Sequence, residues 1–271
     1  MSFFYKWSAL RRIFKYTYPV LSLIDRPLIS IYGKQNPKHP AVFIIGAPRT
    51  GSTILYLMNT NYLNVSYINN FINLGYKNIL LSSILNDMLF KNRPHEFFRS
   101  KLGRTEKGGL NAPNESGSFW YRWIDRNVDY IDEYQAKALP YETIQKNLSA
   151  VLNRFNRPFL FKNMNAGMRI ALLEQMNIPI KYIFIKRNPL YTAQSIINVR
   201  MQVYNDPNIW WSIKPPNYKE LKSLDFVKQS VKQVYSIEKQ ILLDLNRFVD
   251  KENILTLHYE ELSNGEKVLR R

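Results

Sequence analysis

The sequence predicts an α/β fold in which a mostly parallel central sheet is flanked by helices on both faces. Four short apolar runs have the length and composition of buried strands: 41–45, 158–162, 180–186 and 253–258. Longer stretches with helical spacing of apolar residues separate them, as in βαβ units, whose strands are parallel. A chain of 271 residues with 45% hydrophobic content can bury the core of one large domain.

Helices are expected where apolar residues recur at helical spacing: 54–58, 74–90, 141–155, 190–203 and 224–249. A further short strand is expected at 64–70. Two polar or proline-rich stretches are expected to be loops. One is 91–114, interpreted as a flap; the other is 205–216, with Trp210 and Trp211, interpreted as a lid on the acceptor side.

Residues 1–40 form a basic segment ahead of the main domain, which we assign to 41–271. Phe3, Trp7, Leu10 and Phe14 fall at helical spacing and predict an amphipathic helix that ends near Pro19. Two interpretations stay open: the helix packs on the domain, or residues 1–20 contact an anionic membrane. The longest uncharged stretch, 16–24, is too short to span a bilayer, and no signal peptide is evident. A cytoplasmic protein, in the second case peripherally bound to membrane, is therefore expected.

The net charge of +17 predicts anionic partners, such as a nucleotide, a sulfated ligand, nucleic acid or an anionic membrane. No basic-aromatic module of a known nucleic-acid-binding type is present, so no specific nucleic-acid partner is expected. The absence of cysteine excludes disulfides and cysteine-bound metals, and the three histidines are too scattered to suggest a zinc cluster.

The chain is organised around a glycine-bounded loop that joins a strand to a helix. The apolar run ends at Gly46, the loop continues to Gly51, and Ser52 opens the helix. Unpaired N–H groups and the helix dipole make such a junction an anion-binding site, although a β-to-α turn without a ligand has the same pattern. The loop nearly matches the Walker A pattern, but Ser52 replaces the lysine that reaches the outer phosphates of a nucleoside triphosphate. Arg49 supplies a cation from inside the loop.

A second strand-to-helix junction carries the pattern R-[DN]-P-x5-S. Pro189 suits the first position of a helix, and Arg187, at the end of a strand, can bind a phosphate bidentately. Ser195 lies about two turns further along the helix. Alone, Arg-Asn-Pro also fits a routine helix start.

Together, the two junctions resemble the donor-binding motifs of sulfotransferases that use 3′-phosphoadenosine 5′-phosphosulfate (PAPS). The resemblance extends from the first strand to the end of the chain and implies a P-loop-like sulfotransferase fold, with PAPS as co-substrate and no metal. It implies that the 5′-phosphosulfate loop consists of Arg49, Thr50, Gly51, Ser52 and Thr53. The 3′-phosphate would be bound by Arg187 and Ser195.

The resemblance also implies catalytic roles. The sulfuryl group would pass in line to an acceptor hydroxyl on a carbohydrate, a lipid or another small molecule. Lys162, at the end of a strand, and Arg49 would stabilise charge on the leaving group, while Glu115 would accept the proton. The histidine that often follows the strand-end lysine in the family is missing, because Asn163, Met164 and Asn165 come next. His95 is the reserve candidate for the base.

Several features leave other interpretations open. Many family members continue with further helices, so the stretch 265–271 is interpreted as the beginning of one, and the C-terminal part as short. The Tyr259-Glu-Glu-Leu262 element is interpreted as mostly structural. The aromatic cluster of Phe119, Trp120, Tyr121 and Trp123 fits either an acceptor site or ordinary core. The rival functions are a P-loop kinase and a non-catalytic protein that binds polyanions or membrane on a degenerate sulfotransferase fold.

Overall fold

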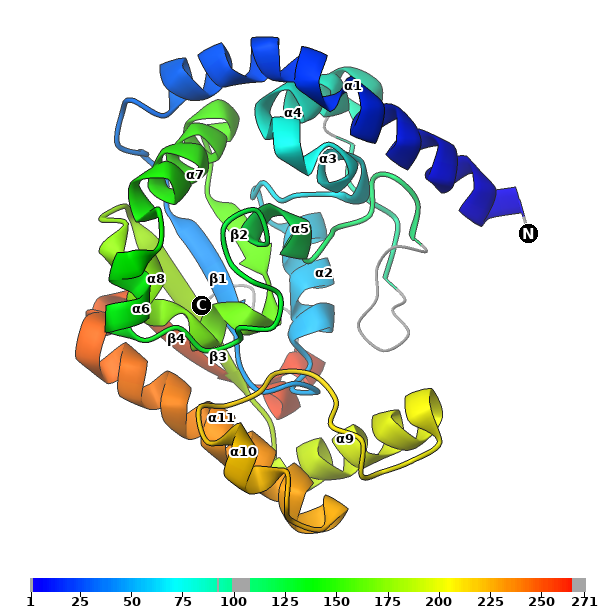
Figure 1. Cartoon of the computed structure of the whole chain (residues 1–271), viewed down its shortest axis with the longest axis vertical. Helices are drawn as coiled ribbons and strands as arrows, with labels where there is room; N and C mark the ends of the chain where they lie inside the picture. Colours follow the sequence, from blue (N-terminus) through cyan, green and yellow to red (C-terminus); the bar gives the residue numbers. More distant parts are fainter. Residues whose placement is uncertain (1, 92, 99–107, 265–271) are drawn as a thin grey trace.

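A computed structural model describes residues 2–91, 93–98 and 108–264 (Figure 1). Its centre is one sheet of order β2-β1-β3-β4, in which all neighbouring strands are parallel. The strands are β1 (Ala41–Ile45), β2 (Phe159–Lys162), β3 (Ile180–Lys186) and β4 (Ile254–His258). The four predicted strands and the parallel sheet are therefore confirmed, to within one residue at each strand start.

The register of the sheet places aromatic side chains side by side at its centre. Phe43 pairs with Phe161 on one side and Tyr182 on the other, with ring centroids 5.0 Å and 6.2 Å away. All three residues are almost fully buried. Because parallel strands are covered on both faces, such continuous apolar composition is what the fold requires.

Helices cover both faces of the sheet, as expected. On one face, Phe43 and Ile45 belong to the large core shared with α7 (Tyr141–Phe155), α8 (Ile170–Gln175) and α11 (Phe226–Phe248). On the other face, Ile44 packs with Leu55 and Tyr56 of α2 (Ser52–Tyr62). The remaining helices are α3 (Asn70–Leu74), α4 (Ile79–Phe90), α5 (Gly117–Trp120), α6 (Glu133–Ala138), α9 (Pro189–Tyr204) and α10 (Tyr218–Leu221), with 3-10 turns η1 (Tyr76–Asn78), η3 (Met164–Met168), η4 (Lys251–Asn253) and η5 (Tyr259–Asn264).

The strand expected at 64–70 is wrong. Only two isolated bridges form there, from Ser66 to Phe159 and from Asn69 to Pro113. The Asn69 side chain instead caps α3 by accepting a hydrogen bond from the Ile72 amide at 2.9 Å. Asparagine is a preferred helix cap, and this local bond ends the extended segment.

The N-terminal helix, α1 (Ser2–Tyr32), does not end near Pro19 as expected but continues through Pro19 and Pro27. Its second half is held by contacts with the rest of the domain. Asp25 accepts a hydrogen bond from the Leu81 amide at 2.8 Å, and the Ser22 hydroxyl donates to the Asn78 side chain at 3.0 Å. These contacts offset the backbone hydrogen bond that each proline removes. The packing interpretation is therefore confirmed for this face of α1.

The two expected loops are partly accounted for. The stretch 205–216 contains no helix or strand, as expected. Parts of the 91–114 flap, at 92 and 99–107, lie outside the described residues, as does the helix start expected at 265–271. The aromatic cluster contributes mainly to the core, since Phe119 and Trp120 are buried there. In the described part of the chain, no helix is long and apolar enough to cross a membrane.

Candidate active site

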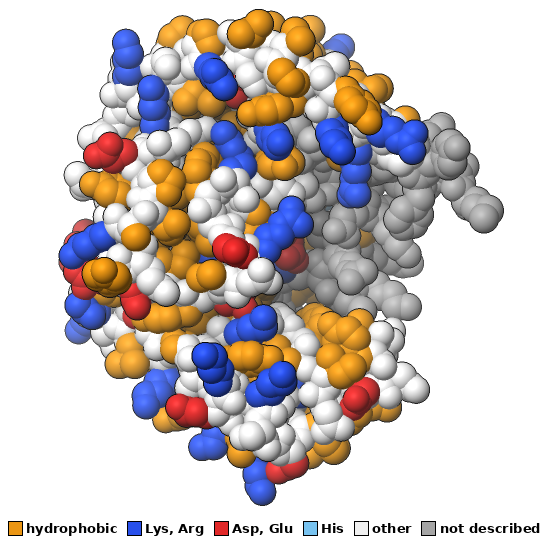
Figure 2. Space-filling model, in the orientation of Figure 1, with side chains coloured by type: hydrophobic (Ala, Val, Ile, Leu, Met, Phe, Trp, Pro, Cys, Tyr) orange, Lys and Arg blue, Asp and Glu red, His pale blue; other side chains and the backbone are white. Residues whose placement is uncertain are grey.

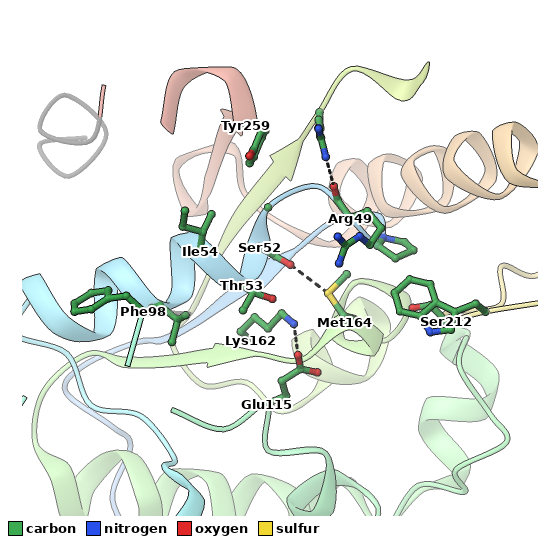
Figure 3. Close-up of a pocket in the computed structure, with 15 residues that line it drawn as sticks. Arg49, Ser52, Thr53, Ile54, Phe98, Glu115, Lys162, Met164, Ser212 and Tyr259 are labelled. Carbon is green, nitrogen blue, oxygen red and sulfur yellow. Dashed lines mark hydrogen bonds and ion pairs between the residues drawn. The ribbon is translucent and has the colours of Figure 1, made fainter. Parts of the chain in front are cut away.

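A cavity of about 390 Å³ lies beyond the carboxyl ends of β1, β2 and β3 (Figure 3). Open parallel sheets bind their ligands at this edge. Seven of the nine residues predicted for the site line it: Arg49, Gly51, Ser52, Thr53, Glu115, Lys162 and Arg187. Residues more than 130 positions apart in the chain therefore line one cavity, because neighbouring parallel strands end at the same edge of the sheet.

The loop between β1 and α2 bends through three residues with positive φ: Gly46 at 155°, Arg49 at 74° and Gly51 at 89°. A side chain at Gly51 would collide with the ring of Tyr259, only 2.2 Å from the position of its Cβ. Thr50 does not line the cavity. It is fully buried, and its hydroxyl donates to the Ala47 carbonyl at 2.8 Å, so it shapes the loop.

Arg49 joins the two predicted phosphate motifs. Its Nε donates a hydrogen bond to the Ser195 hydroxyl at 3.0 Å, and Arg187 donates from Nη1 to the Arg49 carbonyl at 3.2 Å. Ser195 is thus the ninth predicted residue, placed beside the cavity through Arg49. A non-glycine residue in the left-handed region is uncommon and is found preferentially at functional sites.

The turn that carries Arg187 is fixed from both sides. Asn188 caps α9 by accepting a hydrogen bond from the Leu190 amide at 3.0 Å, and Pro189 occupies the first turn of the helix. The Asn188 amide in turn donates to Glu260 at 3.1 Å. These contacts fix the turn between the end of β3 and the start of α9, from which the Arg187 side chain extends.

The cavity has an excess of positive charge. Three cations and one carboxylate line it, and the carboxylate of Glu260, whose pKa is lowered by the Asn188 amide and in part by Arg187, lies outside the lining. Burial, and then the neighbouring Arg187, lower the pKa of Arg49. Two guanidinium groups held this close favour a bound anion, which would relieve their repulsion.

Lys162 and Glu115 form an ion pair on the floor of the cavity. The lysine side chain is only 3% exposed, whereas the glutamate side chain is 39% exposed. A buried ammonium requires a partner, and Glu115 supplies it. The carboxylate therefore lies beside a cation and still faces the solvent-filled part of the cavity.

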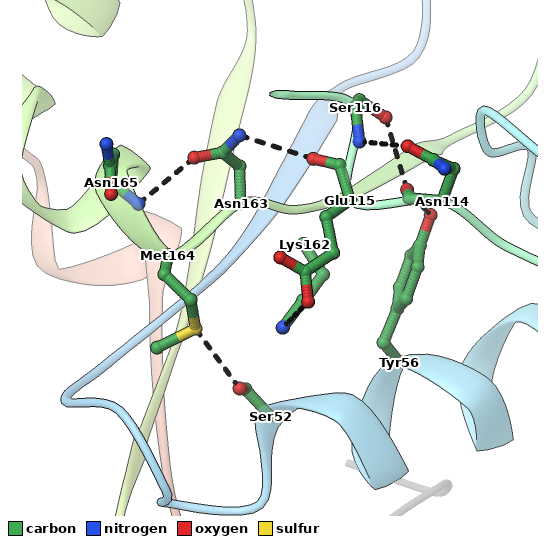
Figure 4. A network of polar contacts seen from close by, with 9 residues as sticks. All are labelled: Ser52, Tyr56, Asn114, Glu115, Ser116, Lys162, Asn163, Met164 and Asn165. Carbon is green, nitrogen blue, oxygen red and sulfur yellow. Dashed lines mark hydrogen bonds and ion pairs between the residues drawn. The ribbon is translucent and has the colours of Figure 1, made fainter. Parts of the chain in front are cut away.

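Hydrogen bonds hold the loop that carries Glu115 (Figure 4). Tyr56 donates from its hydroxyl to the Asn114 carbonyl at 3.1 Å, and Asn163 donates from Nδ2 to the Glu115 carbonyl at 3.2 Å. Burial raises the pKa of Tyr56 well above its usual value, so the phenol stays protonated and remains a donor. Ser116, with φ of 59°, donates its amide to the Asn114 side chain at 2.9 Å.

His95 does not line the cavity. Its ring is buried, with Nε2 3.0 Å from the Thr60 hydroxyl and Nδ1 accepting from the Phe97 amide at 3.2 Å. Burial lowers the pKa of His95. Both ring nitrogens make polar contacts inside the protein, away from the cavity. The position of His95 therefore does not support its reserve assignment as a base.

The prediction missed several lining residues, of which Tyr259 matters most. The ring of Tyr259 lies over Gly51, and the Arg187 guanidinium carbon is 4.5 Å from the ring centroid. The interpretation of the Tyr259 element as structural overlooked this, because only the register of β4 beside β3 brings Tyr259 to the cavity. The other lining residues outside the predicted site are Pro48, Ile54, Leu57, Phe98, Met164, Trp211 and Ser212.

Comparison with known proteins identifies the family of the chain. A sequence profile of the sulfotransferase family matches residues 40–271, so the chain belongs to the sulfotransferase family. No match was found among curated protein sequences.

Two solved structures are similar. Sulfotransferase STF9 from Mycobacterium avium is 16% identical with a TM-score of 0.54, and the match covers 92% of this chain and 65% of STF9. A sulfotransferase domain from the curacin biosynthetic pathway is 18% identical with a TM-score of 0.45, over 86% of this chain and 72% of that domain. The likeness to STF9 shows the fold, and this chain spans less than two thirds of the length of STF9.

Proposed function

We propose that the cavity binds PAPS and transfers its sulfuryl group to an acceptor hydroxyl. The observation that carries the proposal is that Arg49 and Arg187 line one positively charged cavity, with Ser195 held beside it by a hydrogen bond from Arg49. A nucleotide with phosphates at both the 3′ and 5′ positions needs two anion sites of this kind. The cavity volume of about 390 Å³ falls within the range of small-molecule sites.

In the proposed reaction, the acceptor oxygen attacks sulfur while the bond from sulfur to the 5′-phosphate oxygen breaks. The electron pair of that bond stays with adenosine 3′,5′-bisphosphate, the leaving group. The acceptor proton passes to Glu115, whose carboxylate is exposed toward the cavity. Transfer of a proton to a positioned base contributes about 10²–10⁴-fold to a rate.

Negative charge grows on the 5′-phosphate as the bond breaks. The amides at the start of α2 and the Lys162 ammonium are fixed before the reaction, since the loop and the strand end hold them. Donors positioned in advance stabilise such charge by about 3–4 kcal/mol each in comparable sites. Arg187 and Ser195 would bind the 3′-phosphate, which does not change in the reaction.

The acceptor side of the cavity has an aromatic and apolar wall. Trp211 and Phe98 line it, together with the Ser212 hydroxyl. Flat apolar surfaces next to a polar group suit a sugar, an aryl alcohol or a lipid alcohol. Trp211 lies in the stretch expected to form a lid, and we assign this stretch to acceptor binding.

The kinase alternative has less support. The lysine that would reach the outer phosphates of ATP is replaced by Ser52, whose hydroxyl donates to the Met164 sulfur at 3.4 Å. The other alternative is a non-catalytic protein that binds polyanions or membrane on a degenerate sulfotransferase fold, and a transfer assay distinguishes it from an enzyme.

The proposal is tested with PAPS that carries a radioactive sulfuryl group. The protein is incubated with an aryl alcohol, a sugar and a fatty alcohol in separate reactions. Label on at least one acceptor, lost in Arg49→Gln, is expected. Release of bisphosphate without label on any acceptor would contradict acceptor transfer. Binding of bisphosphate with no turnover of PAPS would favour the non-catalytic alternative.

A further inference from the structure

Helix α1 has an apolar face that the domain does not cover. Six bulky side chains on it are each more than half exposed, namely Ile13, Tyr16, Val20, Leu23, Ile24 and Ile31. Their spacing of three, four or seven residues, with Ile24 next to Leu23, places them in one stripe along the helix. We call these six residues the α1 stripe. Exposed apolar patches of this kind usually mark an interaction surface.

The α1 stripe lies away from the face that packs on the domain. The packed face includes Phe14, whose ring meets Phe71 edge to face, and the buried Ser22 and Asp25. The fold of the domain therefore explains one side of α1 and leaves the stripe without a role in the core. In Figure 2, hydrophobic side chains follow the upper edge of the molecule, where α1 runs in Figure 1.

The exposed charges on the described part of α1 are all positive. Arg11, Arg12, Lys15 and Arg26 are exposed on the described part of the helix. Its acid, Asp25, is 1% exposed and faces inward, where it accepts the Leu81 amide. An apolar stripe with basic residues beside it is the pattern of a helix that lies in the surface of an anionic bilayer.

A second cavity opens beside the basic part of α1. Its volume is about 410 Å³, and it lies between α1 and the stretch 73–78. Arg11 and Lys15, one turn apart on α1, line one side, and Lys77 lines the other. None of its described lining residues is acidic. Three cations around a cavity without a carboxylate fit a phosphate group.

We infer that α1 docks the protein on an anionic lipid surface. The stripe lies in the boundary between headgroups and acyl chains, and the second cavity takes a lipid headgroup phosphate. A second copy of the chain is a poorer occupant, because pairing two such helices would bring their exposed arginines and lysines together. This surface is separate from the donor cavity, so the inference does not depend on the proposed sulfuryl transfer.

The test measures sedimentation of the full chain with vesicles of neutral phosphatidylcholine alone or mixed with anionic phosphatidylglycerol. Binding to the mixed vesicles, weakened by salt, is expected. Leu23→Glu should lower the partition coefficient at least tenfold, because a charge replaces a leucine that the bilayer would bury. Leu243→Glu, at an exposed position on α11 across the molecule, is the matched control and should bind normally.

The cavity is tested with paired lysine variants. The double variant Lys15→Gln and Lys77→Gln should lower binding to anionic vesicles by more than tenfold. Each lysine near an anionic surface strengthens binding by about fivefold. Lys219→Gln with Lys222→Gln removes the same charge near α10 and should have little effect. Equal binding to neutral and anionic vesicles would overturn the inference, as would equal losses of binding in a variant and its control. It would also be overturned if the protein formed a soluble dimer that did not bind vesicles and that Leu23→Glu dissociated.

Discussion

Arg49 combines an unusual backbone conformation with contacts to both halves of the proposed donor site. Its φ of 74° turns the side chain toward Ser195, while its carbonyl accepts from Arg187. The sequence marks Arg49 as a loop cation, but it does not show that the residue bridges the two motifs. That role follows from the adjacency of β1 and β3, which places the two strand ends beside each other.

Glu115 is the residue on which the proposed proton transfer depends. Glu115→Gln keeps an oxygen that can accept from Lys162 but removes the basic carboxylate. The expected result is a loss of about 10²–10⁴-fold in the rate of transfer, measured with labelled PAPS and an accepted alcohol. The affinity for adenosine 3′,5′-bisphosphate, measured by calorimetry, should change by less than about twofold.

Glu133→Gln serves as the control, because Glu133 lies on α6 and makes exposed ion pairs with Lys137 and Arg247. It should leave transfer unchanged. Full transfer activity of Glu115→Gln would contradict the assignment of Glu115 as the base, whatever the control shows.

At the scale of elements, the junctions that follow β1 and β3 build the proposed donor site, and η5 after β4 supports them. The residue after β4 is Tyr259, whose ring fills the space above Gly51. The loop, the Arg187 turn and η5 therefore form one packed unit. A side chain at position 51 should displace the Tyr259 ring and so disrupt the packing of this unit.

Gly51→Ala tests that packing. The added methyl group would lie 2.2 Å from the Tyr259 ring, and the alanine would keep a φ of 89°, so a weaker affinity for bisphosphate is expected. Gly109→Ala is a matched control, since Gly109 has a similar φ of 86° and no atom within 4 Å of its Cβ position. Both variants should lose about 1 kcal/mol through the strained backbone, and Gly51→Ala should lose more in denaturant titrations because the Tyr259 ring must shift. Only Gly51→Ala should lose affinity, and equal affinities would contradict the packed unit.

Sequence reasoning recovered the elements whose pattern is local. Buried parallel strands are continuous apolar runs, and both strand-to-helix junctions carry their own glycine, proline or asparagine signals. It failed where distant contacts decide the structure. The continuation of α1 past Pro19 depends on Ser22 and Asp25 reaching residues near α4. The role of Tyr259 depends on the order of the strands, which no local pattern specifies.

At the scale of the whole molecule, α1 and α11 run along opposite edges of the domain (Figure 1). The long helix α11 buries charged groups against the core. Asp244 is 5% exposed, and burial raises its pKa to about 6. Gln240 donates to one of its oxygens at 2.9 Å, while the other oxygen has no hydrogen-bond partner among the described residues.

The raised pKa of Asp244 predicts how stability depends on pH. Because the folded state holds the proton more tightly than the unfolded state, the free energy of unfolding should fall as pH rises from about 4 to 6 and stay low above that. Asp244→Asn should remove about 1–3 kcal/mol of this fall. Denaturant titrations at pH 4, 5, 6 and 7 measure it, and an equally steep fall in the variant would show that Asp244 is not its source.

The most direct test of the central claim is a calorimetric titration with adenosine 3′,5′-bisphosphate, with ATP titrated in parallel. The donor site proposed around Arg49, Arg187 and Ser195 predicts selective binding of the bisphosphate. It also predicts a loss of at least tenfold in affinity for Arg187→Gln, because a bidentate phosphate contact disappears. Selective binding of ATP, or no binding of either nucleotide, would contradict the account.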